Sequence, residues 1–454
     1  MIPQPKFDKS YVPEYYVNPK NVINELRKHM LIDGFQFVLD IDKSAGAYFI
    51  DAATGKKYLD FFTCFASMPI GVNHPKLSDQ TFLNYLAKIS INKPSNSDIY
   101  TEAMASFVKT FFELAVPEKF SYSFFISGGA LAVENALKAA FDWKIRKNWQ
   151  KGIKGEIGTK IIHFLQAFHG RSGYTMSLTN TDPSKTDLYP KFPWPRIINP
   201  KIQFPLDNNN LEAVIKIEKK AIEEIKLAFF ENKNDIAAII IEPIQGEGGD
   251  NHFRPDFLQS LRQLSDENQS LLIFDEIQTG VGITGTMWAH EQLGVIPDIM
   301  TFGKKMQICG IIATDRLDEV PENVFHTSSR INSTWGGNLT DMVRATKYLE
   351  IIEEENLLSN VIIMGDYLIK NLIKLQNEFP QIISNARGRG LFCAFDVSDV
   401  TLRGQIIKNC FENGLFILPC GIKSIRFRPP LNITKELLEE GLSIVHKAIL
   451  QSFK

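Results

Sequence analysis

The sequence predicts an α/β protein with a large domain built on a mainly parallel sheet and a smaller α+β domain. Between about residues 98 and 302, helical stretches alternate with apolar runs that show no polar alternation, as is typical of strands covered by helices on both faces. The order strand, helix, strand implies parallel strands joined by crossover connections. After about residue 340 a long helix leads into short strands and helices, which indicates a second unit.

Five apolar runs are the expected strands of the large sheet: 123–126, 160–165, 236–241, 271–274 and 299–302. Before them we expect a helix near 22–31 and a hairpin from 47–50 and 57–61. After them we expect a helix at 341–355, a strand at 391–397, a helix at 402–413, strands at 415–418 and 424–427, and a helix at 435–453. This pattern divides the chain into an N-terminal segment that joins the small domain (1–70), a large domain that binds the cofactor (71–345) and a C-terminal small domain (346–454).

Composition argues against several classes of function. The net charge of -2 gives no basic excess for nucleic acid or an anionic membrane, and no apolar run is long enough to span a bilayer. The lysine-rich stretch 144–154 is expected to be a solvated helix face and its exit loop. Five scattered cysteines without a C-x-x-C pair, and no apolar stretch at residues 1–6, favour a reducing cytoplasm. The histidines show no metal-binding spacing, so no metal site is expected.

A glycine pair marks a candidate phosphate site. Ser127-Gly128-Gly129-Ala130 follows an expected strand and opens an expected helix, whose first N–H groups and positive dipole end would attract an anion. An ordinary strand–helix turn is the alternative. A second glycine motif, G-x-G-x-x-G at 280–285, is not followed by the helix and acidic strand end that a dinucleotide site needs.

An acid and a lysine follow two of the expected strands. Asp275 ends the strand at 271–274, and Lys304 follows the strand at 299–302. Ligands of open α/β sheets bind at the carboxyl ends of strands. A carboxylate there can keep a pyridine nitrogen protonated, and a desolvated lysine can attack an aldehyde. Pyridoxal 5'-phosphate carries a phosphate, a pyridine nitrogen and an aldehyde, which together match the three features; the alternative for Lys304 and Lys305 alone is a surface lysine pair.

Over roughly residues 35–450 the chain resembles the class III aminotransferases of fold type I. The resemblance rests on IEPIQGEGG at 241–249, FDEIQTG at 274–280 and TFGK at 301–304. Within that family the chain is most similar to the lysine 6-aminotransferases, through SGGALAVEN at 127–135, FGKKMQICG at 302–310 and NSTWGGN at 332–338. Most members have a glutamate where Leu131 stands and a glycine-rich loop where residues 306–309 stand, which argues against an ornithine enzyme.

The resemblance implies a set of cofactor contacts. Lys304 is implied to bond the cofactor aldehyde and to act as general base, and Asp275 to pair with the pyridine nitrogen. The other implied contacts are the amides of Gly129 and Ala130 at the phosphate, Phe168 and Ile277 on the two ring faces, Gln278 near the ring hydroxyl, and Thr334 of a second subunit at the phosphate. Phe168 could instead be a core residue, and Gln278 could serve only to orient the backbone.

The resemblance also implies the substrate contacts. Arg171 matches a binder of a distal carboxylate, and Arg426 matches the binder of an α-carboxylate. Glu247 matches the acid that pairs with that arginine when it is unused. Arg428 is the alternative to Arg426, because both lie on one face of a strand.

The activity implied by the resemblance is transfer of the ε-amino group of L-lysine to 2-oxoglutarate by a cytoplasmic homodimer, giving 2-aminoadipate 6-semialdehyde and glutamate. The partners are then small molecules, with no nucleic acid and no membrane. An ornithine or 4-aminobutyrate aminotransferase is the nearer alternative. The remote one is a non-catalytic binding protein of the same fold.

Overall fold

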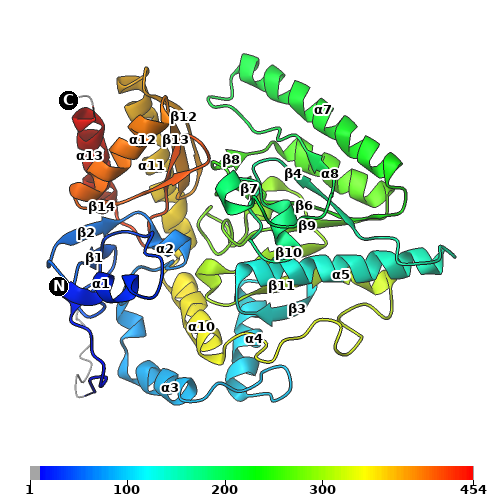
Figure 1. The fold of residues 1–454 in the computed structure, drawn as a ribbon, viewed down its shortest axis with the longest axis horizontal. Helices are drawn as coiled ribbons and strands as arrows, with labels where there is room; N and C mark the ends of the chain where they lie inside the picture. Colours follow the sequence, from blue (N-terminus) through cyan, green and yellow to red (C-terminus); the bar gives the residue numbers. More distant parts are fainter. Residues whose placement is uncertain (1–10, 453–454) are drawn as a thin grey trace.

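A seven-stranded sheet lies at the centre of the larger part of the molecule (Figure 1). The computed structural model describes residues 11–452; the expectations for residues 1–6 and for Phe453 lie outside this range. The strands are β3 (Phe120–Ile126), β4 (Lys160–Phe164), β5 (Arg196–Ile197), β6 (Ile236–Ile241), β9 (Leu271–Asp275), β10 (Ile299–Phe302) and β11 (Cys309–Thr314). Their order is β3-β11-β10-β9-β6-β4-β5. Only β11 runs antiparallel to its neighbours, which confirms the mainly parallel sheet.

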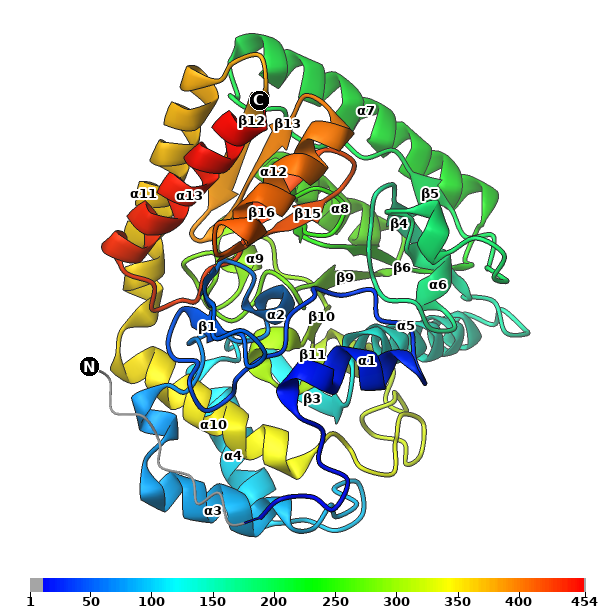
Figure 2. The same cartoon turned by 60° about the vertical axis from the view of Figure 1, so that its left-hand side comes forward.

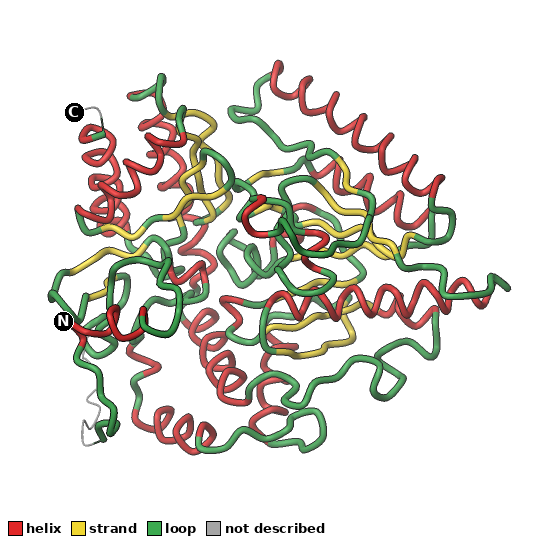
Figure 3. Tube along the Cα trace, viewed as in Figure 1, coloured by secondary structure: helices red, strands yellow, loops and turns green. Residues whose placement is uncertain are grey.

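Helices cover both faces of this sheet, as the uninterrupted apolar runs predict (Figure 3). On β6, Ala238 and Ile240 belong to the apolar cluster formed with α5 (Gly129–Gln150). Ile239 and Ile241 belong to the cluster formed with α7 (Asn208–Glu231) and α8 (Pro255–Glu267). Each fully buried isoleucine contributes about 2 kcal/mol, so both faces of the strand stabilise the sheet.

The smaller part is an antiparallel sheet with three helices. Its strands are β12 (Ile383–Arg389), β13 (Phe392–Val397), β16 (Ser424–Phe427) and β15 (Leu418–Cys420), in that order. Its helices are α11 (Leu357–Glu378), α12 (Val400–Glu412) and α13 (Lys435–Gln451). The single strand expected at 415–418 is wrong. Its first half is a separate strand, β14 (Leu415–Phe416), because that half pairs with the N-terminal segment while β15 pairs with β16.

The N-terminal segment lies against the C-terminal part (Figure 2). β1 (Tyr48–Ile50) and β2 (Lys57–Asp60) form the expected hairpin, and β14 adds to it in parallel. Phe49, Tyr58 and Phe416 share a buried cluster there. α1 (Val22–Arg27) is shorter than the expected helix at 22–31, because none of its residues is buried and short unpacked helices are marginal. The division at residues 70 and 345 stays a prediction.

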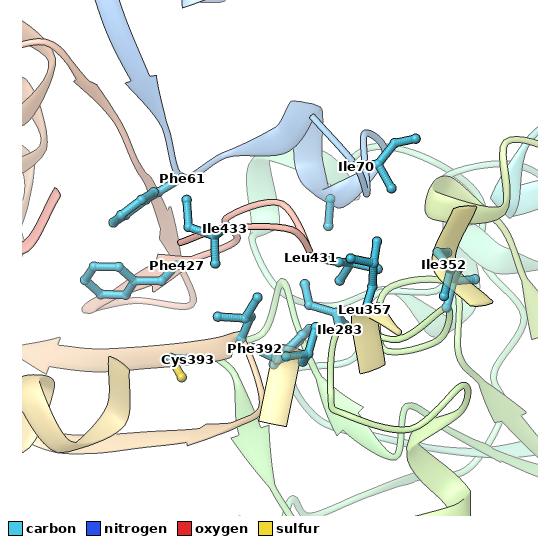
Figure 4. Packing of buried hydrophobic residues seen from close by; sticks show 14 of the residues in the cluster. Phe61, Ile70, Ile283, Ile352, Leu357, Phe392, Cys393, Phe427, Leu431 and Ile433 are labelled. Carbon is cyan, nitrogen blue, oxygen red and sulfur yellow. The ribbon is translucent and has the colours of Figure 1, made fainter. Parts of the chain in front are cut away.

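The remaining helices and a short hairpin connect these parts. They are α2 (Thr63–Ala66), α3 (Gln80–Ser90), α4 (Glu102–Leu114), α6 (Thr175–Leu178), α9 (Ala289–Leu293), α10 (Leu339–Glu354), β7 (Ile244–Gln245) and β8 (Asn251–His252). Buried apolar side chains from all three regions of the chain meet between the two sheets, among them Phe61, Ile283 and Phe427 (Figure 4). This shared core fixes β16 beside the carboxyl edge of the large sheet.

Lys144 corrects the expectation of a solvated helix face. Its side chain is buried on α5, and Nζ donates to the carbonyl oxygens of Asn268 (3.2 Å) and Gln269 (2.7 Å). The two carbonyls replace water as partners of the ammonium. Separately, among residues 11–452 no helix is both long enough and apolar enough to cross a membrane.

Candidate active site

The expected site residues meet at the carboxyl edge of the large sheet. Asp275 ends β9, Lys304 follows β10, Glu242 follows β6 and Phe168 follows β4. These strands are parallel, and Asp275 is in register with Thr301 of β10. Gly129 opens α5 after β3, which runs in the same direction. The sheet therefore brings together segments that are far apart in the sequence.

Asp275 is held rigidly by three neighbours. His169 Nδ1 lies 2.8 Å from Asp275 Oδ2, while the Thr301 hydroxyl and the Ile277 N–H donate to Oδ1 at 3.0 and 3.2 Å. All three contacts are satisfied by the ionised carboxylate, if His169 carries its proton on Nδ1. The arrangement presents a fixed negative charge inside the cavity.

Lys304 projects into the same cavity from a strained turn. Its backbone has φ +49°, which is unusual for a residue with a side chain and is found mainly at functional sites. The pKa of Lys304 is lowered to about 8, chiefly by burial and next by the nearby Arg426 cation, while Glu247 acts in the opposite direction. A substantial fraction of the amine is therefore neutral near pH 8 and can act as a nucleophile or base.

The amino end of α5 forms the anion-binding end of the cavity. Gly128 precedes the helix with φ +104° and has no side chain to cap it. A methyl group on Gly129 would lie 3.2 Å from Ile277 Cδ1, so a larger residue there would press on a side chain that lines the cavity. The first N–H groups of α5 are oriented toward an anion in the way a phosphate requires.

The cavity has the shape and donors that pyridoxal 5'-phosphate needs. It encloses about 340 Å³, and its lining includes Gly129, Ala130, Phe168, Asp275, Ile277, Gln278 and Lys304. Thus every residue of one chain that is expected to contact the cofactor lines this cavity, and the contacts themselves stay predictions. The Phe168 N–H donates to Glu242 Oε1 (2.9 Å), which fixes the aromatic segment. Burial raises the pKa of Glu242 to about 7.

The two arginines that are expected to bind substrate differ in whether a carboxylate pairs with them. Arg426 Nη2 lies 2.9 Å from Glu247 Oε2. Arg171 is exposed, lines both the inner cavity and a larger outer one, and has no carboxylate partner among residues 11–452. One of the two cations is therefore paired with an acid, whereas the other has no carboxylate beside it among the described residues.

Arg428 is committed elsewhere. It is fully buried, its two terminal nitrogens donate to the carboxylate of Asp250 at 2.9 and 2.6 Å, and Nη2 also donates to Gln278 Oε1 (3.1 Å). A bidentate buried pair of this kind is costly to break. The geometry therefore favours Arg426 over Arg428 as the arginine that can bind substrate, although both roles stay predictions.

Gln278 is positioned by this pair and by a glycine. A methyl group on Gly246 would come within 2.3 Å of Gln278 Oε1, so a side chain at position 246 would displace the glutamine. Gln278 thus lines the cavity while it also contacts Arg428. Its proposed contact with the ring hydroxyl stays a prediction.

A left-handed turn borders the site. All four residues of α2, Thr63 to Ala66, have φ between +44° and +62°. Asp60 Oδ1 accepts the N–H groups of Phe62 (2.8 Å) and Thr63 (2.7 Å), and the Thr63 hydroxyl donates to the carbonyl oxygen of Arg428 (2.8 Å). These bonds offset the strain and tie the turn to the arginine strand.

Two further expectations concern Thr334 and the absence of a metal site. Thr334 is exposed and does not line the cavity of its own chain, so its role at the phosphate of a second subunit stays a prediction. Over the described part of the chain, no group of three or more histidine, cysteine, aspartate and glutamate side chains could hold a metal ion.

Four residues of the site do not stand out in the sequence: His169, Glu242, Lys185 and Asp250. His169 and Glu242 lie within motifs noted for their neighbours, so only their contacts are new. Lys185 ends a short 3-10 turn (Pro183–Lys185) in a loop without periodicity, yet Nζ lies 2.6 Å from Glu247 Oε1. No local pattern signals such a contact.

Comparison with known proteins agrees with this site. The model of the aminotransferase class-III family matches residues 33–449. The L-lysine-epsilon aminotransferase of Mycobacterium tuberculosis is 49% identical over 432 residues, covering 95% of this chain and 96% of that protein. The mitochondrial 4-aminobutyrate aminotransferase of Mus musculus is 32% identical, covering 96% and 89%. A solved lysine aminotransferase from M. tuberculosis superposes with a TM-score of 0.94 at 48% identity, covering 96% of this chain and 100% of that one. The chain therefore belongs to the class III aminotransferases, enzymes of the fold type I group that depend on pyridoxal 5'-phosphate.

Proposed function

We propose that this chain is an L-lysine 6-aminotransferase. It would move the ε-amino group of L-lysine to 2-oxoglutarate and release 2-aminoadipate 6-semialdehyde and glutamate. The observation that carries the proposal is the contrast between two arginines at one site. Arg426 is closed by Glu247, whereas Arg171 is open at the mouth of the cavity.

This contrast favours a donor whose amine is far from its carboxylate. With Arg426 neutralised, an α-amino acid finds no cation near the reactive lysine, while Arg171 can bind a carboxylate at the far end. L-lysine presents its ε-amine in this orientation. When 2-oxoglutarate enters, its α-carboxylate can replace Glu247 on Arg426, and its other carboxylate can take the place of lysine's carboxylate on Arg171.

The chain's own groups supply the rest of the reaction. When bound, pyridoxal 5'-phosphate supplies an aldehyde that accepts amino groups and a ring that withdraws electrons. Lys304, whose pKa is lowered to about 8, can take a proton from the substrate carbon and deliver it to the cofactor carbon. Asp275, fixed by His169 and Thr301, would pair with the ring nitrogen and keep it protonated. Phe168 and Ile277 line the cavity and would lie against the two faces of the ring.

The alternatives differ in the amino donor or in catalysis itself. Ornithine and 4-aminobutyrate also carry a terminal amine, so the arginine contrast alone does not separate them from lysine; the higher identity to lysine enzymes favours lysine. A non-catalytic binding protein would have no need for Lys304 and Asp275 in one cavity.

Single-turnover absorbance with each of the three donors tests the proposal. We expect L-lysine to convert the cofactor fastest at equal donor concentration, with ornithine and 4-aminobutyrate slower by about tenfold or more, since one or two methylenes change the reach to Arg171. A faster reaction with either rival would assign the enzyme to that donor, and no conversion by any of them would favour a binding protein.

We also propose a cytoplasmic homodimer whose two sites are shared between subunits. The exposed position of Thr334, outside the cavity of its own chain, supports sharing. The five free cysteines support a reducing compartment. With a net charge of -2, the proposed partners are small molecules, namely L-lysine, 2-oxoglutarate and glutamate, and not nucleic acid.

A further inference from the structure

Glu247 is shared between two cations. Oε2 lies 2.9 Å from Arg426 Nη2, and Oε1 lies 2.6 Å from Lys185 Nζ. The three side chains differ in exposure: Arg426 is 4% exposed, Glu247 24% and Lys185 26%. The carboxylate therefore joins a buried cation of the substrate site to a more accessible cation of the outer cavity.

Lys185 is placed to act at the boundary of the site. It ends the 3-10 turn that Asp182 caps through the Ser184 N–H (2.9 Å), and it lines the outer cavity together with Arg171. Its ammonium lies 5.7 Å from the centre of the Phe168 ring, which lines the inner cavity. Lys185 thus touches the machinery of the site without entering the inner cavity.

We propose that Lys185 is a positioning residue that holds Glu247 when Arg426 turns to the carboxylate of a dicarboxylate substrate. The inference rests on the proposed function, because it assumes that Arg426 alternates between Glu247 and substrate. Lys185 thereby determines how readily the site accepts a dicarboxylate.

The physical reason is the cost of an unpaired charge. If Lys185 were absent, opening the Arg426–Glu247 pair would leave the half-buried carboxylate of Glu247 without a partner, which is unfavourable. Lys185 already bonds the other carboxylate oxygen, so Glu247 keeps one cation after Arg426 leaves. Burial raises the pKa of Glu247, but Arg426 and Lys185 together lower it below its ordinary value, so the carboxylate is charged while it bridges the two cations.

Arg426 is also prepared for a second carboxylate. Its Nε is buried and has no hydrogen-bond partner among the described residues, so Glu247 does not satisfy the guanidinium completely. A bidentate substrate carboxylate could use the whole edge of the arginine.

Binding of glutarate to the holoenzyme, measured by calorimetry, tests the proposal without turnover. Glutarate has the two carboxylates of 2-oxoglutarate but no reactive group. Lys185→Met should weaken glutarate binding about tenfold, the size of one charge-assisted contact. Lys185→Arg should restore it, since arginine keeps the charge. Lys191→Met, in the same loop with its loose partner Asp187 at 3.9 Å, is the matched control and should leave binding unchanged.

A double-mutant cycle separates positioning from a general structural role. If Lys185 acts through Glu247, Lys185→Met should have no further effect on glutarate binding in a Glu247→Gln background. An equal loss in both backgrounds, or no loss in the single variant, would overturn the proposal.

The half-reactions separate this inference from the proposed function. With the enzyme loaded with pyridoxamine 5'-phosphate, Lys185→Met should raise the concentration of 2-oxoglutarate needed for half-maximal rate about tenfold, while the lysine half stays within about twofold. Equal losses in both halves would overturn the role of Lys185. A wild-type enzyme that binds glutarate but does not react with lysine would contradict only the proposed donor.

Discussion

At the scale of single residues, the environment of Lys304 distinguishes it from its neighbour Lys305. Lys304 lines the cavity, whereas Lys305 is buried beneath it and donates to the carbonyl oxygen of Gln278 (2.7 Å). Lys304→Ala should bind cofactor without a covalent bond, and turnover should fall by several orders of magnitude. Absorbance of the purified protein, followed by denaturation to release the cofactor, measures the bond.

Lys305→Met is the control for that variant. Methionine fills similar volume, so the covalent cofactor bond should survive even if stability falls. A covalent bond that persists in Lys304→Ala, or disappears only in Lys305→Met, would move the role to the other lysine.

Asp275 is a second residue whose charge matters more than its shape. Asp275→Asn keeps the size of the side chain but removes the negative charge next to the expected ring nitrogen. Proton transfer from substrate should slow by about a hundredfold or more, while lysine binding changes little. The kinetic isotope effect with lysine deuterated at the ε-carbon measures this step. Near-normal turnover in the variant would show that another group holds the ring charge.

At the scale of elements, the left-handed turn beside the arginine strand depends on Asp60. Burial raises the pKa of Asp60 to about 7, although the N–H groups of Thr63 and Phe62 lower it in part. The folded protein therefore binds the proton more tightly than the unfolded chain, where the pKa is about 4. This contribution to stability is fully present below pH 4 and is lost as the pH rises to about 7.

Asp60→Asn should remove this pH dependence. The amide oxygen can still accept both N–H groups, and the other carboxylate oxygen has no partner to lose among the described residues. The fall in the thermal unfolding midpoint between pH 5 and pH 8 should shrink by about 2 °C or more in the variant. Asp207→Asn, at the exposed cap of α7, should leave that difference as in the wild type. An unchanged difference in Asp60→Asn would show that the turn is not pH-sensitive.

The elements also show what the sequence could predict. Five strands of the large sheet and the groups that follow them could be predicted, because buried parallel strands are apolar throughout and ligand-binding groups follow their carboxyl ends; the two-residue β5 was not expected. β11 was missed because its apolar run follows a lysine turn that reads as loop, and its antiparallel pairing depends on β3 and β10. α11 and β12 were also missed; the sequence of β12, ISNARGR, is polar and shows no apolar run.

Some residues of the site could likewise be predicted from the sequence, and others could not. Asp275 and Lys304 occupy positions that strand order makes meaningful, whereas Lys185 reaches Glu247 across 62 residues from an irregular loop. Asp250 pairs with Arg428 across 178 residues. Such contacts form only in the folded structure, so the hydrophobic periodicity and the local spacing of residues in the sequence do not predict them.

At the scale of the whole molecule, the proposed sharing of sites can be tested by mixing variants. Lys304→Ala and Thr334→Ala subunits are unfolded together, refolded and purified as mixed dimers with two different tags. If Thr334 acts across the interface, each mixed dimer contains one site with both Lys304 and Thr334 intact. Its activity should then approach half that of the wild type, because one of two sites is complete.

The contrary outcome is equally clear. If Thr334 acts within its own chain, each mixed dimer should show only half the activity of the Thr334→Ala protein. If Thr334 has no role at the site, the Thr334→Ala protein itself should be as active as the wild type. A protein that remains a monomer at full activity during sedimentation would also exclude sharing.

The central claim is that the terminal amine of lysine is the one transferred, because Glu247 closes Arg426 while Arg171 stays open. Nitrogen-15 labelling tests this most directly. The enzyme is incubated with 2-oxoglutarate and L-lysine labelled at either the ε- or the α-nitrogen, and the glutamate formed is analysed by mass spectrometry. The account predicts labelled glutamate from ε-labelled lysine and unlabelled glutamate from α-labelled lysine. Labelled glutamate from the α-labelled donor would contradict it.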